Sequence, residues 1–289
     1  MSVLAPEHVT LVEMAPRDGL QNEKRLVDTK DKIHLVDLLS DCGYQRIEVT
    51  SFVSPKWVPQ MADASAVMAG IKRRPGTRYA ALTPNMQGFD AALAAKADEV
   101  AIFASASETF SQKNINCSIA ESIERFRPVA EACRASAVPL RGYVSCVVEC
   151  PYEGAIAPES AAQVAAALMV LGCYEISLGD TIGRGTPEAV DAMLAAVLAH
   201  VPAEQLAGHF HDTSGRALDN IGVALERGLR VFDASAGGLG GCPYAPGAAG
   251  NVDTLDVNAF VIGRGFSTGL DAARLEDAAA FARSLRSAG

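Results

Sequence analysis

No apolar run in the chain approaches the ~20 residues that a helix needs to cross a bilayer. The first residues, MSVLAPEHVT, contain neither a basic segment nor an apolar signal core. We therefore expect a cytoplasmic protein with no membrane partner. A basic surface is lacking as well, because 34 acidic residues outnumber 25 basic ones and the net charge is −9. This charge argues against nucleic acid as a partner, since neutralising phosphates requires a basic face. A small anionic molecule held by a few local cations remains compatible with it.

The seven cysteines do not form the paired clusters of a disulfide framework or a zinc ribbon. We expect them to be reduced thiols. Cys146 and Cys150 are close in sequence, but their segment YVSCVVEC is typical of a buried strand and its end. That pattern favours a packing role for both.

What the chain does contain is a repeated alternation of apolar, strand-like runs and helical patterns. The eight predicted strands cover residues 9–14, 44–50, 77–83, 99–105, 140–146, 173–179, 206–211 and 231–236. The predicted helices cover residues 29–42, 85–97, 119–136, 158–172, 187–200 and 216–227. Eight repeats without a long linker predict an α/β protein with one (β/α)₈ TIM barrel domain over residues 1–289, in which 265–289 form a C-terminal helical extension. A doubly wound open sheet is the alternative.

Two of the predicted helices carry end signals. The segment 29–42 has apolar residues at helical spacing and stops at Gly43, where glycine suits a left-handed cap. The segment 187–200 follows Thr186, which we expect to be the N-cap, and has Pro187 in its first turn.

The most informative motif is GHFHDTSG, in which His209 and His211 are two residues apart at the end of a predicted strand. Side chains i and i+2 of a strand point to the same side, so two imidazoles can share one metal ion. Asp18, in EMAPRDGLQNE, would supply a carboxylate, and Asn251 would supply an amide oxygen. The alternatives are a core histidine, an aspartate in a turn, and an asparagine that caps a helix over 252–264.

A barrel would bring these distant groups together, because its first, seventh and eighth strands become neighbours and its active site lies at the carboxyl ends of the strands. Arg17 and Asp18 follow the first strand, Glu48 lies at the end of the second, and Asp180 follows the sixth. An open sheet would not guarantee this convergence. Two imidazoles, a carboxylate and an amide suit Mg²⁺ or Mn²⁺, although the histidines also admit Zn²⁺ or Co²⁺.

Four further residues at this rim have predicted roles. Arg17 would hold a carboxylate or stabilise an enolate oxygen, unless it only pairs with Glu48 or Asp180. Glu48 and Asp180 would orient Arg17 and the metal ligands, or act directly. Cys242 lies in the glycine-rich run GGLGGCPYAPGAAGN, and such a loop can close over a ligand and bring a thiol to the reacting carbon.

Several longer strings together carry a family resemblance across nearly the whole chain, in the same order. They are PRDGLQNE (16–23), TSFVSPKWVPQMAD (50–63), KNINCSI (113–119), RGYVSC (141–146), CPYEG (150–154), CYEISLGDTIGRGTP (173–187), HFHDT (209–213) and GLGGCPYAPGAAGN (238–251). The sequence resembles the 3-hydroxy-3-methylglutaryl-CoA lyase family. That resemblance implies a metal-dependent (β/α)₈ enzyme that cleaves this acyl-CoA to acetyl-CoA and acetoacetate, in leucine catabolism, commonly as a homodimer.

Carried over by position, the resemblance implies site roles for six residues. The metal ligands would be Asp18, His209, His211 and Asn251. Arg17 would contact the substrate and Cys242 would be the catalytic cysteine. The metal would chelate the tertiary hydroxyl, His209 or a nearby carboxylate would take its proton, and Cys242 would protonate the acetyl-CoA carbon.

Three other functions compete with this one. A lyase for a longer 3-substituted 3-hydroxyglutaryl-CoA, as in terpenoid degradation, would use the same residues. A Claisen-type condensing enzyme or aldolase would share the Arg-Asp-Gly start and the His-x-His pair, and would release free thiol from acetyl-CoA and a 2-oxo acid. A non-catalytic metal or acyl-CoA binding module would bind metal without turnover. The cysteine-bearing loop and the absence of an added regulatory domain favour the lyase.

Overall fold

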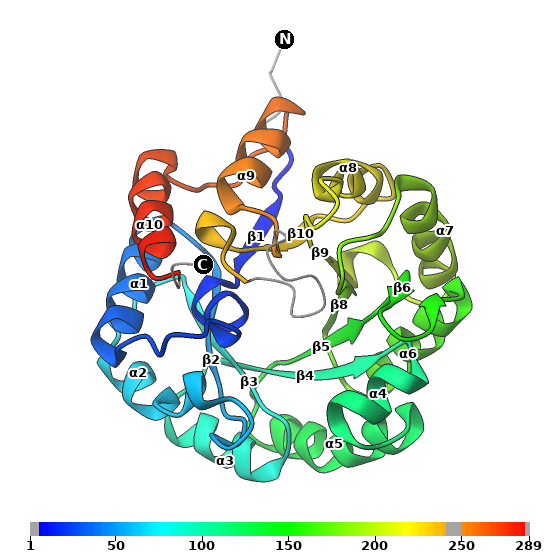
Figure 1. Cartoon of the computed structure of the whole chain (residues 1–289), viewed down its shortest axis with the longest axis horizontal. Coiled ribbons are helices and arrows are strands. Elements are labelled where there is room, and N and C mark those ends of the chain that lie inside the picture. Colours follow the sequence, from blue (N-terminus) through cyan, green and yellow to red (C-terminus); the bar gives the residue numbers. More distant parts are fainter. Residues whose placement is uncertain (1–5, 241–249, 287–289) are drawn as a thin grey trace.

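The computed structural model describes residues 6–240 and 250–286, and eight parallel strands in this part of the chain close into a barrel (Figure 1). Each strand lies within two residues of its predicted position. The barrel strands are β1 (Thr10–Glu13), β2 (Arg46–Ser51), β3 (Arg78–Leu82), β4 (Glu99–Ser105), β5 (Leu140–Ser145), β8 (Glu175–Asp180), β9 (Leu206–Phe210) and β10 (Val231–Ala234). The predicted α/β barrel is confirmed.

Closure of the barrel excludes the open-sheet alternative. Thr10 of β1 pairs in parallel with Val231 of β10, and Asp233 of β10 pairs with His209 of β9. The first, seventh and eighth barrel strands are therefore neighbours, as the convergence of the metal ligands requires.

The helices surround the barrel (Figure 1). They are α1 (Thr29–Asp41), α2 (Ala64–Gly70), α3 (Met86–Ala94), α4 (Glu108–Ile115), α5 (Ile119–Ala135), α6 (Pro158–Leu171), α7 (Pro187–Leu198), α8 (Ala217–Glu226), α9 (Thr254–Gly263) and α10 (Ala272–Ser284). α10 lies in the predicted C-terminal extension and packs on α1. None of the helices in the described residues could span a membrane.

The sequence analysis missed three elements. It assigned neither α2 nor α4, and it missed the small antiparallel hairpin of β6 (Glu149–Cys150) and β7 (Gly154–Ala155). Both helices have at most eight residues, too few to show a helical period clearly.

The predicted helix ends agree with the backbone geometry. Thr186 is the N-cap of α7, where its side chain accepts a hydrogen bond from the Ala189 N–H, and Pro187 occupies the first turn. Gly43 follows the C-cap of α1 with a φ of +94°. Only a residue without Cβ adopts this conformation at low cost.

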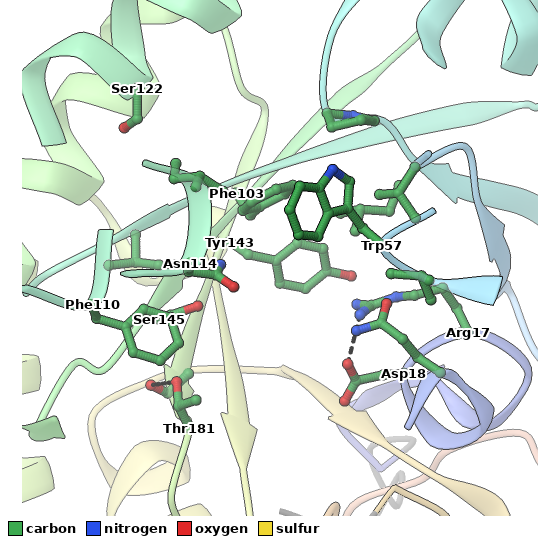
Figure 2. Close-up of a pocket in the computed structure, with 18 of the residues that line it drawn as sticks. Arg17, Asp18, Trp57, Phe103, Phe110, Asn114, Ser122, Tyr143, Ser145 and Thr181 are labelled. Carbon is green, nitrogen blue, oxygen red and sulfur yellow. Dashed lines mark hydrogen bonds and ion pairs between the residues drawn. The ribbon is translucent and has the colours of Figure 1, made fainter. Parts of the chain in front are cut away.

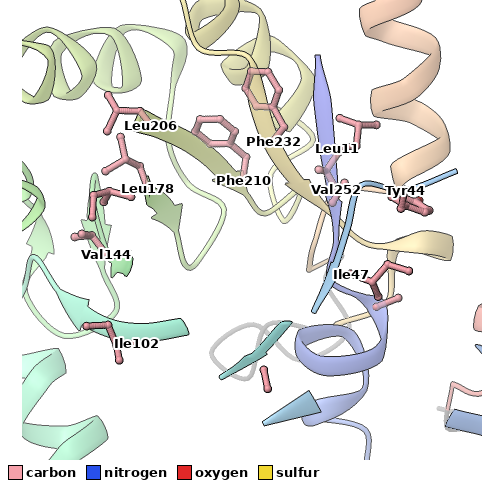
Figure 3. Packing of buried hydrophobic residues seen from close by; sticks show 14 of the residues in the cluster. Leu11, Tyr44, Ile47, Ile102, Val144, Leu178, Leu206, Phe210, Phe232 and Val252 are labelled. Carbon is pink, nitrogen blue, oxygen red and sulfur yellow. The ribbon is translucent and has the colours of Figure 1, made fainter. Parts of the chain in front are cut away.

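The outer face of the barrel carries the main apolar core. Every second side chain of a strand points outward, and these side chains pack against the helices as an apolar layer. Figure 3 shows part of this layer. Representative residues are Leu11, Ile47, Ile102, Val144, Leu178, Leu206, Phe210 and Phe232. This layer holds the strands in register and leaves the inner face free for other side chains.

The inner face of the barrel is largely charged. Arg46 donates to both carboxylate oxygens of Glu175, at 2.7 and 3.0 Å. Arg141 also donates to Glu175, at 2.7 Å, and reaches Asp233 at 2.7 Å. All four side chains are buried, and this ladder of ion pairs runs up the barrel interior to β10, beside the predicted metal ligands.

Candidate metal centre and active site

Asp18, His209 and His211 meet at the carboxyl end of the barrel. One ligand atom from each lies within 4.8 Å of the others. The Nε2 atoms of the two histidines are 3.3 Å apart, and Nε2 of His209 is 3.7 Å from Oδ2 of Asp18. The structure thus brings together three residues that the sequence predicts as ligands although 191 positions separate Asp18 from His209.

A tight turn after β1 presents Asp18. Residues Ala15–Gly19 form a single π-helical turn in which the N–H groups of Arg17 and Gly19 both donate to the Met14 carbonyl. A Cβ added at Gly19 would lie 2.8 Å from Cβ of Leu239. Glycine therefore lets this turn pack closely against the segment that follows β10.

Asn251 completes the ligand group. Its Nδ2 atom donates to Oδ2 of Asp18 at 2.8 Å and to the Leu239 carbonyl at 3.2 Å. The amide nitrogen is therefore engaged, which leaves Oδ1 as the donor atom available for a cation. Asn251 does not cap the following helix, because Asp253 is the N-cap of α9 and accepts from the Leu255 N–H.

The charge states of Asp18 and His211 fit a cation. At His209 the effect of burial is outweighed by Asp233 and Asp18, which raise the pKa of this imidazole. Burial opposes ionisation of Asp18, but the charges of Arg17 and of the two histidines outweigh it and lower the pKa of Asp18 to about 2. Burial and the neighbouring His209 lower the pKa of His211 to about 4. A carboxylate and a neutral imidazole, with a second imidazole nitrogen 3.3 Å away, form a donor set that a divalent cation prefers.

Arg17 lies beside this group and is fixed from two sides. Its Nε donates to Glu48, and its Nη1 donates to Oδ1 of Asp18 at 2.6 Å. Burial opposes the charge of Arg17, but the two carboxylates raise its pKa above the ordinary value. The predicted ion pair with Glu48 is present, and it holds the guanidinium at the wall of the cavity rather than removing it from the site.

Two residues at this site were missed by the sequence analysis. The Tyr143 hydroxyl donates to Glu48 and accepts from Nη1 of Arg141 at 2.9 Å. Asp233 lies 3.1 Å from Nδ1 of His209. Strand register offers a signal for both, since Tyr143 pairs with Ser177 and Asp233 pairs with His209 across the sheet. Paired residues of neighbouring parallel strands share a face.

Asp180 does not join this group. It pairs with the outward-facing Phe210, and its carboxylate accepts from the Gly185 N–H at 2.8 Å and from the Arg184 N–H at 3.3 Å. Burial raises the pKa of Asp180 to about 6 against these hydrogen bonds. Within the described residues, no hydrogen bond or ion pair is seen between Asp180 and Arg17 or the metal ligands.

A cavity of about 790 Å³ opens from the metal group. Arg17, Asp18, His209 and His211 line one end, where Figure 2 labels Arg17 and Asp18. Across the cavity, beyond Tyr143, lie Phe110 and Asn114 (Figure 2). Its lining combines apolar side chains, among them Leu82, Trp57, Phe103 and Phe126, with the cations Lys113 and Arg125. Such a cavity can hold an elongated ligand with an apolar middle and anionic ends.

Cys242 lies outside the described residues, but both ends of its segment are described. Gly240, which lines the cavity, accepts a hydrogen bond from the Asn251 N–H at 3.1 Å. Its φ is +105°, and an added Cβ would lie 2.4 Å from Nδ2 of Asn251. The segment between residues 240 and 251 therefore starts and ends at the metal group.

Known proteins resemble this chain in both sequence and fold. A family model described as HMGL-like matches residues 8–282. A 3-hydroxy-3-isohexenylglutaryl-CoA/hydroxy-methylglutaryl-CoA lyase from Pseudomonas aeruginosa is 58% identical over 273 residues, which are 94% of this chain and 91% of that protein. The crystal structure of the HMG-CoA lyase from Brucella melitensis has a TM-score of 0.96 at 65% identity and covers 97% of this chain and 99% of that one. An HMG-CoA lyase from Acinetobacter baumannii in complex with coenzyme A and 3-methylmalate is 36% identical with a TM-score of 0.91, over 98% of this chain and 93% of that one.

Proposed function

The chain belongs to the HMGL-like family, and from this premise we propose that its site cleaves 3-hydroxy-3-methylglutaryl-CoA to acetyl-CoA and acetoacetate. It is a carbon–carbon lyase, as its similarity to lyases of 58% and 65% identity across most of the chain supports. The observation that carries the proposal is the meeting of Asp18, His209 and His211 at one end of a cavity large enough for an acyl-CoA.

We propose that Asp18, His209, His211 and Oδ1 of Asn251 hold one divalent cation, Mg²⁺ or Mn²⁺. A carboxylate and an amide oxygen are hard donors that suit Mg²⁺ and Mn²⁺, whereas the two imidazoles also admit Zn²⁺ or Co²⁺. When bound, such a cation supplies Lewis acidity, which acidifies a coordinated hydroxyl and polarises a carbonyl. The hydrogen bond from Asn251 to Asp18 keeps the two oxygen ligands from opposite ends of the chain together.

Cleavage breaks the C2–C3 bond of the substrate. The proton of the tertiary hydroxyl passes to a basic atom at the metal end of the cavity. The carboxylate of Asp18 is the described candidate, because Nε2 of His209 would bind the cation and Nδ1 of His209 lies 3.1 Å from Asp233. The electron pair of the broken bond moves into the thioester as an enolate, and the former alcohol carbon becomes the ketone of acetoacetate. Arg17 remains a cation, so a guanidinium fixed by Glu48 and Asp18 can stabilise the enolate oxygen without reorganisation.

Glu48 and Tyr143 act by holding Arg17. The carboxylate of Glu48 receives both the Arg17 Nε–H and the Tyr143 hydroxyl, so its orientation is fixed by two donors. This arrangement keeps the guanidinium aimed at the cavity. Asp180 has a different role in this proposal, since its hydrogen bonds shape the segment between β8 and α7.

Cys242 would return a proton to the acetyl-CoA carbon. The support for this role is the resemblance to the lyases together with the two ends of the glycine-rich segment, which lie at Asp18 and Asn251. General-acid transfer from a positioned side chain is worth roughly 10²- to 10⁴-fold in rate.

The opposite end of the cavity would receive the coenzyme A part. Lys113 and Arg125 lie there on α4 and α5, and the phosphates of coenzyme A are the anionic groups that need cations. Apolar side chains between the two ends would pack along the pantetheine chain. A solved relative contains coenzyme A, which supports an acyl-CoA as the small-molecule partner.

A second candidate substrate is a longer 3-substituted 3-hydroxyglutaryl-CoA. The Pseudomonas aeruginosa relative is described as acting on a 3-isohexenyl and a methyl substrate, and Phe103, Phe126 and Leu82 offer an apolar wall for such a substituent. Which pathway the enzyme serves, leucine catabolism or terpenoid degradation, follows from this choice.

We also propose that residues 1–289 form a single domain, that the protein is a homodimer and that it is cytoplasmic.

The test is to incubate the metal-loaded chain with 3-hydroxy-3-methylglutaryl-CoA and with 3-alkyl analogues of increasing length, and to follow acetyl-CoA and the ketone product. Equimolar acetyl-CoA and acetoacetate from the methyl substrate support the lyase. Release of free coenzyme A from acetyl-CoA and a 2-oxo acid, without cleavage, would support the condensing enzyme instead. Metal binding without any turnover would indicate a non-catalytic binding module.

A further inference from the structure

β10 places Asp233 directly opposite His209 inside the barrel. Oδ2 of Asp233 is 3.1 Å from Nδ1 of His209, the ring nitrogen on the far side from the other ligands. Asp233 is 1% exposed and His209 is 8% exposed. The pair is therefore shielded from water, where a single hydrogen bond has a large effect on geometry.

The surroundings of Asp233 keep it an anion. Arg141 donates to Oδ1 at 2.7 Å and to Oδ2 at 3.2 Å, and Oγ of Ser177 donates to Oδ2 at 2.7 Å. Two hydrogen bonds from the Arg141 guanidinium and one from the Ser177 hydroxyl favour the ionised form of this carboxylate. An ionised carboxylate only accepts hydrogen bonds, so the proton between the two groups lies on Nδ1 of His209.

The second histidine has no equivalent support. Nδ1 of His211 is buried and lacks a hydrogen-bond partner among the described residues. The Nε2 atoms of both rings face each other at 3.3 Å. The two imidazoles therefore contribute similar ligand atoms but are held differently: Nδ1 of His209 has a carboxylate partner, and Nδ1 of His211 has none among the described residues.

We propose that Asp233 is a positioning residue of the metal centre: it accepts the Nδ1 proton of His209, fixes the tautomer that leaves Nε2 free to bind the cation, and makes His209 the firmly held ligand of the pair. The inference rests on the proposed metal site and extends it to a residue that touches neither cation nor substrate. Arg141 and Ser177 donate hydrogen bonds to Asp233, and Arg141 also connects Asp233 to the other ion pairs of the barrel interior.

Replacing Asp233 by asparagine reverses the hydrogen bond. Arg141 only donates, so the amide oxygen of Asp233→Asn is drawn to Arg141 and its NH₂ group turns toward Ser177 and His209. Nδ1 of His209 must then accept, which moves the ring proton to Nε2, the atom that faces the cation. The side chain keeps its size, so packing changes little.

The first measurement reads the tautomer without metal or substrate. Two-bond ¹H–¹⁵N spectra of the metal-free chain, labelled in its five histidines, are recorded at about pH 9, above the ordinary histidine titration range. His209→Gln identifies the signals of His209. We expect the Nδ1–H form in the wild type and the Nε2–H form in Asp233→Asn. The Nε2–H form in the wild type would overturn the proposal, and this holds even if the variant does not fold.

The second measurement is Mn²⁺ affinity, from the electron paramagnetic resonance signal of free Mn²⁺. Loss of the outer hydrogen-bond partner of a ligand typically weakens metal binding by roughly 10- to 100-fold, and we expect this for Asp233→Asn. Glu99→Gln is the matched control, because Glu99 is an equally buried carboxylate at the amino end of β4, the end of the barrel away from the metal group. The control should change affinity by less than about threefold.

The outcomes separate the two proposals. Absence of Mn²⁺ binding by the wild-type chain would remove the metal site and this inference with it. Tight binding by the wild type that Asp233→Asn leaves unchanged would overturn the inference alone. An equal loss in Glu99→Gln and Asp233→Asn would also overturn it, since the effect would then belong to any buried carboxylate.

Discussion

His211 and Asn251 face each other across one antiparallel β-bridge between the end of β9 and the segment that leads into α9. The bridge ties the second histidine of the pair to the amide that contacts Asp18. Backbone pairing therefore sets the distance between two predicted ligands, and side-chain packing alone does not have to do so. The same bridge lies next to the hydrogen bond that joins Gly240 to Asn251.

Asn251→Ala should weaken Mn²⁺ binding by roughly 10- to 100-fold, because it removes both the amide oxygen and the donor that orients Asp18. Asn220→Ala is the control, since Asn220 is also buried but donates to the Gly185 carbonyl away from the ligands. Equilibrium dialysis with Mn²⁺ measures both. Unchanged affinity in Asn251→Ala would remove this residue from the ligand set.

Tyr143→Phe should lower kcat by roughly 10- to 100-fold with little change in Mn²⁺ affinity, because Glu48 loses one of the two donors that fix it against Arg17. Tyr79→Phe is the control: this tyrosine is equally buried, and its hydroxyl contacts Oγ of Ser40 and the Arg74 N–H on the far side of β3. Steady-state kinetics on both variants give the comparison. Equal losses would show that any buried tyrosine hydroxyl matters to the same extent.

Lys113→Ala and Arg125→Ala should raise KM for the acyl-CoA by about fivefold each while kcat stays near the wild-type value, since each removes about 1 kcal/mol of binding to phosphate. The effect should shrink as salt is added. Arg127→Ala on the same helix is the control, because Arg127 pairs with Glu124 at 2.6 Å and is not part of the cavity lining. A loss of kcat alone would contradict the assignment of this end of the cavity to coenzyme A.

Cys242→Ser should reduce turnover by roughly 10²- to 10⁴-fold, the usual contribution of a general acid, and leave bound metal unchanged. Metal analysis of the purified variant, together with acetyl-CoA release, tests both parts. Wild-type turnover would take Cys242 out of the mechanism, and loss of metal would point to a ligand role.

Stability of the metal-free chain should fall as the pH rises from 4.5 to above 7, through ionisation of Glu13. Burial raises the pKa of this fully buried carboxyl from 4.5 to about 7, against hydrogen bonds from Tyr44, Thr254 and two backbone N–H groups. A raised folded-state pKa means that the contribution is complete below the unfolded value and is lost as pH passes the folded one, a change of roughly 3 kcal/mol. Urea unfolding of the wild type and of Glu13→Gln across this range measures it. Parallel curves for the two proteins would refute it.

Much of the fold is readable from the chain because eight apolar runs recur with helical patterns between them. The ligand group is readable because His209 and His211 have strand spacing and Asp18 follows another strand. The sequence pattern did not show which residues of each strand point into the barrel and which point outward. Proximity to a strand end suggested Asp180, whereas Gly179 is the residue that pairs with His209 and lines the cavity. The alternation of inward-facing and outward-facing residues along a strand also identifies Asp233 and Tyr143. Nearness to the end of a strand does not identify them.

The ion pairs inside the barrel constrain how this sequence can change over time. Arg46 and Arg141 share Glu175, and Arg141 also pairs with Asp233, so deleting any one member leaves a buried charge without its partner. Such a loss costs roughly 3–5 kcal/mol, whereas replacing a whole set by well-packed apolar residues is often neutral. Substitutions at these positions should therefore be tolerated only in combination.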